Sequence, residues 1–225
     1  MPYQTVSADL VHYLADTLFP TYERFDPAHN ITHIRAVIEN SMELAQSYDV
    51  VPDMVYTIAA YHDIGIPLGR KTHHLTSGQI LSEDDNLLRW FTPQQITVMR
   101  EAIEDHRASA ASPPRSIYGC IIAEADRDLR LESVIMRCYQ YGVSHYPELS
   151  FDEQFDRLYS HMQEKYGEGG YLRLWLRTPK NERGLAQLRG MLSDQATLHA
   201  YVQQHAAAWA CKSEPGGEPD CENLP

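Results

Sequence analysis

The chain has 225 residues, of which 43% are hydrophobic and 22% are charged, and its formal net charge is −12. This composition is ordinary for a globular protein with a full core, and the acidic balance argues against nucleic acid as a partner because a negative surface repels a phosphate backbone. No apolar run approaches the length of a membrane span, so we expect no association with a membrane.

Apolar residues recur along the chain at helical spacing, and turn signals separate the periodic segments. Strong two-residue alternation is missing, so the pattern predicts an all-α fold. In chain order we expect helices over residues 6–19, 31–48, 53–64, 74–89, 94–107, 115–128, 130–141, 151–166, 170–177 and 182–209. Residues 211–225 are rich in Pro, Gly and Glu, and we expect a disordered tail there.

Two helix ends are well marked in the sequence. Thr92, Pro93 and Gln95 have the order of an N-cap, a first helical proline and a capping-box partner. Gly65 and Pro67 stop the preceding helix shortly after its His-Asp dipeptide, in the phrase AAYHDIGIP. That dipeptide therefore belongs to a final helical turn, where the partial negative charge of a helix C-terminus suits a bound cation.

Four polar residues fall on or beside the apolar faces of three predicted helices. They are His33, His62, Asp63 and Asp126. A buried carboxylate without a partner is costly, and imidazole with carboxylate is a common ligand set for divalent metals that activate water. A single buried histidine is more often a hydrogen-bonded core residue, but one shared ion explains the four together better than coincidence does.

Four further histidines are candidates for the same region. His74 and His106 lie on apolar faces, and we expect them to hold a second metal or to contact the substrate, with a core role as the alternative. We expect His73 and His29 to lie outside the set of ligands. His29 precedes His33 by one helical turn and suits the entrance of the site.

The phrases THIRAVIENSMELA, AAYHDIGIP and EADR, in this order, resemble the signature segments of the HD-domain superfamily of metal-dependent phosphohydrolases. The resemblance covers residues 25–140. It implies an HD-domain helical bundle of five or more core helices, in which His33, His62, Asp63 and Asp126 bind the first metal. Because the GYP triplet of the cyclic-dinucleotide branch is missing at residues 105–109, the chain is nearer to compact bacterial HD hydrolases of undefined substrate.

This resemblance leads to a hypothesis about chemistry. The protein would hydrolyse a small phosphate ester or nucleotide with metal-activated water, using one or two divalent ions (Mn, Mg, Fe or Ni). Asp63 would bridge the ions, and His106 and Arg107 would complete the catalytic group. Arg70 and Lys71 would bind the phosphate, with solvated surface charge as the alternative for these cations. A di-iron oxygenase and a nucleotide-binding module without catalysis are the alternative functions.

The remaining expectations concern organisation and location. Residues 1–210 would form a single HD domain, with a core over residues 25–140 and a helical extension over residues 143–210. The first ten residues do not resemble a secretory signal, and the four cysteines lack CxxC spacing. We therefore expect a cytoplasmic protein without thiolate metal sites or a disulfide framework.

Overall fold

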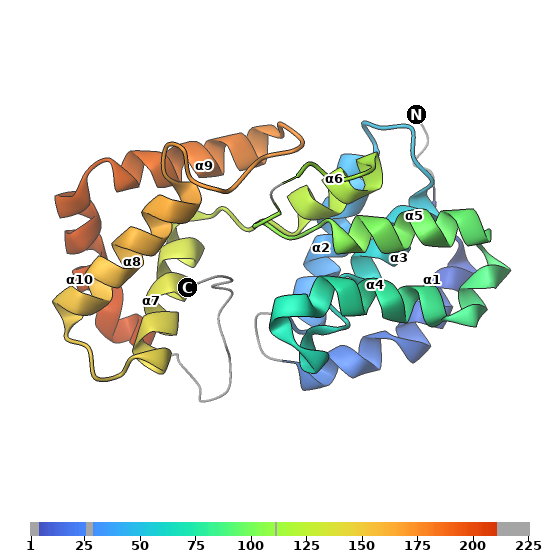
Figure 1. Cartoon of the computed structure of the whole chain (residues 1–225), viewed down its shortest axis with the longest axis horizontal. Coiled ribbons are helices and arrows are strands. Elements are labelled where there is room, and N and C mark those ends of the chain that lie inside the picture. The colour runs from blue at the N-terminus through green and yellow to red at the C-terminus, as the bar shows by residue number, and fades with distance from the viewer. Residues whose placement is uncertain (1–4, 26–28, 111, 211–225) are drawn as a thin grey trace. The chain divides into compact units, whose positions relative to one another are not determined.

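The computed structural model describes residues 5–25, 29–110 and 112–210, and all regular structure within these ranges is helical. The chain forms two compact units, Met1–Arg127 and Asp128–Pro225 (Figure 1). The all-α prediction is confirmed. The unit boundary lies earlier than the limit of 140–143 expected for the HD core, and the expected tail at 211–225 lies outside the described ranges. Among the described helices, none is both long and apolar enough to span a membrane.

The first unit is built from six α-helices and four short 3-10 helices of the described chain. They are α1 (Ala8–Thr17), η1 (Phe19–Arg24), α2 (Ile31–Ala45), α3 (Pro52–Tyr61), η2 (Ile66–Leu68), η3 (Arg70–Thr72), α4 (His73–Glu83), η4 (Asp85–Arg89), α5 (Pro93–Glu104) and α6 (Ile117–Ala125). Helix α2 packs against α3 and α6, and α5 packs against α3, α4 and α6. These contacts bring the ends of α3, α5 and α6 toward the start of α2.

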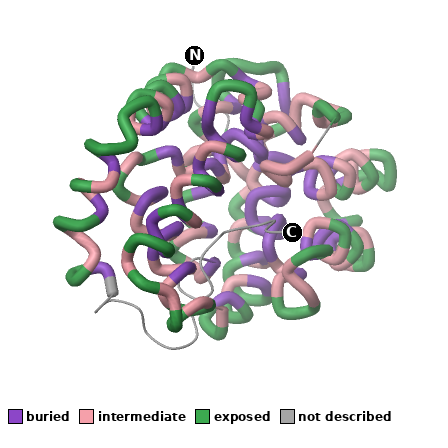
Figure 2. Tube along the Cα trace, turned by 60° about the vertical axis from the view of Figure 1, so that its left-hand side comes forward, coloured by how far each residue is buried: buried purple, intermediate pink, exposed green. Residues whose placement is uncertain are grey.

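The core of this unit follows from the apolar stripes of its helices. Buried and exposed positions alternate along the helices (Figure 2), as amphipathic sequences require. The centre consists of large fully buried side chains, among them Leu10, Tyr22, Ile34, Ile58, Met99, Ile103 and Ile122. The predicted capping box at the start of α5 is present, because the Thr92 hydroxyl accepts from the Gln95 backbone and the Gln95 side chain accepts from the Thr92 backbone.

The second unit contains α7 (Leu131–His145), α8 (Phe151–Tyr166), α9 (Pro179–Leu192) and α10 (Gln195–Ala210). The bounds predicted for α8 match the structure. The single helix expected over residues 182–209 is wrong, because the chain breaks between α9 and α10. The Asp194 carboxylate caps the start of α10 by accepting from the backbone N–H and the hydroxyl of Thr197.

The helix predicted over residues 170–177 is also wrong. The preceding Gly169 has a φ of +82°, and the backbone N–H groups of Tyr171 and Leu172 bond to carbonyls at the end of α8 rather than within their own segment. Leu172 and Leu176 are buried in this segment. The apolar residues of this segment therefore reach the core without forming a helix.

Candidate metal centre

The first cluster of potential metal ligands lies where the start of α2 meets the ends of α3 and α6. The Asn30 side chain caps α2 by accepting from the backbone N–H groups of Thr32 and His33, which fixes His33 in the first turn. The Nε2 atom of His33 lies 3.2 Å from Oδ1 of Asp126 and 3.4 Å from Oδ2 of Asp63. The Nε2 atom of His62 lies 3.2 Å from the same Asp63 oxygen. We call His33, His62, Asp126 and Oδ2 of Asp63 the outer cluster.

The second cluster lies on the other side of the same carboxylate. Oδ1 of Asp63 is 3.5 Å from Nε2 of His73 and 3.8 Å from Nε2 of His106. We call His73, His106 and Oδ1 of Asp63 the inner cluster. The potential ligand atoms of His33, His62 and Asp63 lie within 4.8 Å of one another, and so do those of Asp63, His73 and His106. Asp63 thus faces two histidine groups, one with each oxygen.

The tautomers of three of these histidines are set by nearby backbone carbonyls. Nδ1 lies 2.8 Å from the Ala59 oxygen in His62, 2.7 Å from the Arg70 oxygen in His73, and 2.6 Å from the Ile103 oxygen in His106. A carbonyl can only accept, so each Nδ1 carries a proton and each neutral ring directs a lone pair from Nε2 into the centre. Such bonds to the other ring nitrogen are typical of metal-ligating histidines.

Nitrogen atoms of the centre lie where they would gain from a bound cation. Nε2 of His73 and Nε2 of His106 are 3.2 Å apart, so in the neutral rings two lone pairs would face each other. Within the described chain, the buried Nε2 atoms of His33 and His62 make no hydrogen bond. Buried polar atoms without partners are costly, and either protons or metal ions relieve that cost. The donor set of four imidazoles and two carboxylates fits divalent metal ions.

Without a metal, protons take that role in the outer cluster. Burial alone would lower the pKa of His33 and His62, but the Asp63 and Asp126 carboxylates outweigh it and raise each pKa from 6.5 to about 10. The same imidazolium rings hold the pKa of Asp63 and Asp126 well below the usual range, against the effect of burial. In the inner cluster, burial and the nearby His62 charge lower the pKa of His106.

The inner cluster contains His73 rather than the predicted His74. Adjacent residues point about 100° apart on a helix, and α4 begins at His73 with that side chain turned into the centre. The His74 ring lies beside it, with ring centroids 5.7 Å apart, and supplies no atom to either cluster. Burial and the neighbouring Arg107 lower the pKa of His74 to about 4.

The predicted phosphate-binding residues lie on the segment that joins Asp63 to α4. Nη2 of Arg70 is 3.1 Å and 3.3 Å from the two ring nitrogens of His29, which is buried. Arg107 donates through Nη1 to the Lys71 carbonyl at 2.9 Å, and the Lys71 side chain is exposed. The two arginines therefore brace this segment, and their contact with a substrate stays a prediction.

Residues around the centre support its ligands. The Asn40 side chain donates to the Ala125 carbonyl at 3.1 Å and so ties α2 to the end of α6, next to Asp126. Arg127 donates to Glu124 at 2.7 Å, and this ion pair is buried. Sequence reasoning missed Asn40, which lies one helical turn beyond the buried Val37 on α2.

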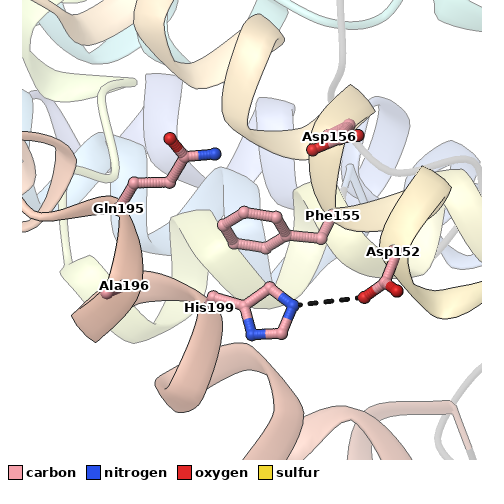
Figure 3. A pocket seen from close by; sticks show the side chains of 6 residues that line it. All are labelled: Asp152, Phe155, Asp156, Gln195, Ala196 and His199. Atoms are coloured by element: carbon pink, nitrogen blue, oxygen red, sulfur yellow. Dashed lines mark hydrogen bonds and ion pairs between the residues drawn. The ribbon is translucent and has the colours of Figure 1, made fainter.

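A separate pocket of about 610 Å³ lies in the second unit, between α8 and α10 (Figure 3). Asp152, Phe155, Asp156, Gln195, Ala196 and His199 line it. His199 Nε2 is 3.3 Å from Oδ1 of Asp152, and its ring lies against Phe155 with centroids 4.6 Å apart. None of the residues predicted for the functional site lines this pocket.

The chain was compared with known proteins in three ways. No curated protein matches the sequence. A structural search matched the crystal structure of a predicted HD superfamily hydrolase from an uncultured Thermotogales bacterium, with 20% sequence identity and a TM-score of 0.47, covering 88% of this chain and 92% of that chain. The family model of the HD domain matches residues 30–131, which include all the residues of both clusters. Residues 30–131 of this chain are an HD domain.

Proposed function

We propose that this protein is a metal-dependent phosphohydrolase that cleaves a small phosphate ester or a nucleotide with water activated by two divalent ions. The observation that carries the proposal is the position of Asp63, whose two oxygens face separate histidine clusters at 3.2–3.8 Å. A carboxylate shared in this way is a suitable bridge between two metal ions. Paired divalent ions lower the pKa of bound water and stabilise the attacking and leaving oxygens of phosphoryl transfer.

The ligand chemistry narrows the choice of metal. Imidazole nitrogens favour ions such as Fe²⁺ and Ni²⁺, whereas Mg²⁺ prefers oxygen ligands and keeps several waters. The four imidazoles of the centre suit Fe²⁺ or Ni²⁺ and its two carboxylates suit Mn²⁺, whereas Mg²⁺ fits this mixed ligand set less well. Neither cluster contains a thiolate, because Cys120 and Cys138, the cysteines within the described ranges, belong to neither.

The chain's own residues have separable roles in this reaction. Asp63, Asp126 and the histidines of the two clusters would hold the ions. His106 would act as a ligand rather than as a proton carrier, because its Nδ1–H donates to the Ile103 carbonyl and its Nε2 faces the inner cluster. Arg107 and Arg70 supply positive charge beside the centre, and guanidinium groups bind phosphate oxygens in pairs. These cations also draw an anionic substrate toward a protein whose net charge is −12.

A metal count combined with an activity screen tests the proposal. Purified protein loaded with Mn²⁺ should bind two ions and release phosphate from at least one member of a panel of phosphorylated metabolites. Asp63→Asn keeps one oxygen and should retain at most one ion with a loss of activity of at least about 100-fold, since a bridging ligand has no substitute. Asp152→Asn, at an exposed carboxylate of the second unit, is the matched control and should behave like the wild type.

Two outcomes would contradict the proposal. The first is phosphatase activity and metal content that survive in Asp63→Asn. The second is protein that binds iron and consumes oxygen, or that binds nucleotides, without hydrolysing any phosphoester in the panel.

A further inference from the structure

Tyr22 packs against the turn that contains His62 and Asp63, and its hydroxyl makes a hydrogen bond that packing alone does not require. Tyr22 lies in η1, which precedes the matched HD region, and it is fully buried. Its hydroxyl donates a hydrogen bond of 2.7 Å to the Ala60 carbonyl, in the last turn of α3. A phenylalanine would fill the same space without this bond.

The Ala60 carbonyl needs a donor because α3 ends abruptly. In a continuing helix this oxygen would accept from the backbone N–H of Ile64, four residues on. Here the Ile64 N–H bonds instead to the Tyr61 carbonyl at 3.1 Å, which tightens the chain into a sharper turn. The last-turn carbonyls of α3 are thereby left to side chains: His62 bonds to Ala59 and Tyr22 bonds to Ala60.

The same hydroxyl also meets the residue that faces both clusters. Burial and the nearby Asp63 charge raise the pKa of Tyr22, and a hydrogen bond from the Asp63 backbone acts in the opposite direction. Tyr22 therefore holds the turn at two points, as a donor to Ala60 and as an acceptor from the Asp63 N–H. Ala60 and Asp63 lie on either side of His62, and Asp63 is the residue whose carboxylate faces both clusters.

We propose that Tyr22 is a positioning residue that fixes the Asp63 backbone so that each carboxylate oxygen faces its own histidine cluster. This inference rests on the proposed two-metal function. Metal sites tolerate ligand displacements of only about 0.2 Å, and loss of a partner that orients a ligand typically weakens metal binding by about 10- to 100-fold. Without the hydroxyl, the Ala60 carbonyl and the Asp63 N–H lose their buried partner, and the turn must shift to satisfy them.

The variant Tyr22→Phe tests the proposal against Tyr13→Phe. Tyr13 also donates a short hydrogen bond, of 2.5 Å to Asp84, within the same unit. It shares Asp84 with the Tyr61 hydroxyl but makes no hydrogen bond to the backbone of the turn. We expect Tyr22→Phe to bind the second Mn²⁺ at least about tenfold more weakly and to lose the spin-coupled two-manganese signal in electron paramagnetic resonance. Tyr13→Phe should keep the affinity and the coupled signal. Equal affinity and an unchanged signal in Tyr22→Phe would overturn the inference.

Amide hydrogen exchange of the metal-free protein separates this inference from the proposed function. The Asp63 amide should exchange at least about tenfold faster in Tyr22→Phe than in the wild type, and at the wild-type rate in Tyr13→Phe. If the wild type binds no second ion while this acceleration is seen, the two-metal function fails and Tyr22 still positions Asp63. If the Asp63 amide exchanges equally in all three proteins, the positioning role is refuted whatever the metal content.

Discussion

Metal binding to the outer cluster should release protons, and the number can be counted. In the metal-free protein His33 and His62 have a pKa of about 10, so both are protonated at pH 7.5. A metal ligand must be neutral imidazole, and the first ion therefore displaces about two protons. Each displaced proton changes the apparent association constant by up to about tenfold per pH unit, or about 1.4 kcal/mol. Two protons predict a gain of up to about 100-fold for each unit of pH between 7 and 9.

Isothermal titration calorimetry provides the measurement. Mn²⁺ is titrated at pH 7.5 into chelator-treated protein in two buffers with different heats of ionisation, and the difference gives the protons released per ion. We expect about two for the wild type and about one for His33→Gln, which lacks one of the two imidazoles. Release of less than about half a proton, or an affinity independent of pH, would refute the claim that His33 and His62 are protonated without metal and lose these protons when it binds.

Two further predictions concern stability. Gly65→Ala places a Cβ 2.7 Å from the Ser77 backbone nitrogen and 2.8 Å from the His73 carbonyl oxygen, so urea unfolding should show a loss of about 1–3 kcal/mol. Gly190→Ala, which meets no atom within 4 Å in α9, should be neutral or stabilising by up to about 1 kcal/mol, and an equal effect of both changes would contradict the reasoning. In metal-free protein the raised pKa of the two outer-cluster histidines stabilises the fold fully below pH 6.5, and this stability is lost toward pH 10. The melting temperature of the metal-free protein should therefore fall between pH 6.5 and pH 10. A melting temperature independent of pH would disprove this link between histidine protonation and stability.

The helices and the outer cluster could be predicted because the sequence patterns that mark them are either local or follow a fixed order along the chain. Apolar periodicity located most helices, and the His…His-Asp…Asp order indicated the HD domain that the family model matches at residues 30–131. Gly65 was interpreted only as a helix stop. The structure gives it a second role, since α4 approaches so closely that the Ser77 hydroxyl accepts from the Gly65 N–H at 2.9 Å. Close contact between distant segments has no signature in helical periodicity.

The inner cluster was harder to predict, because its geometry depends on the conformation of the irregular segment that precedes α4. Two 3-10 turns, η2 and η3, are joined by Gly69 with a φ of +142°, and they decide which residue begins α4. A shift of one residue there exchanges His73 for His74. Tyr22 was missed for a similar reason: it lies in a short 3-10 helix outside the motif, where periodicity does not mark function.

The two clusters differ in their access to solvent, so one side of the centre is open and the other is closed. In the outer cluster the side chains of His33 and Asp126 are 21% and 25% exposed, whereas those of His73 and His106 in the inner cluster are 6% and 3% exposed. An ion held by the outer cluster would be in contact with solvent and substrate, whereas an ion held by the inner cluster would be shielded from both. Loading and stripping should therefore proceed in a fixed order, with the inner ion retained longest.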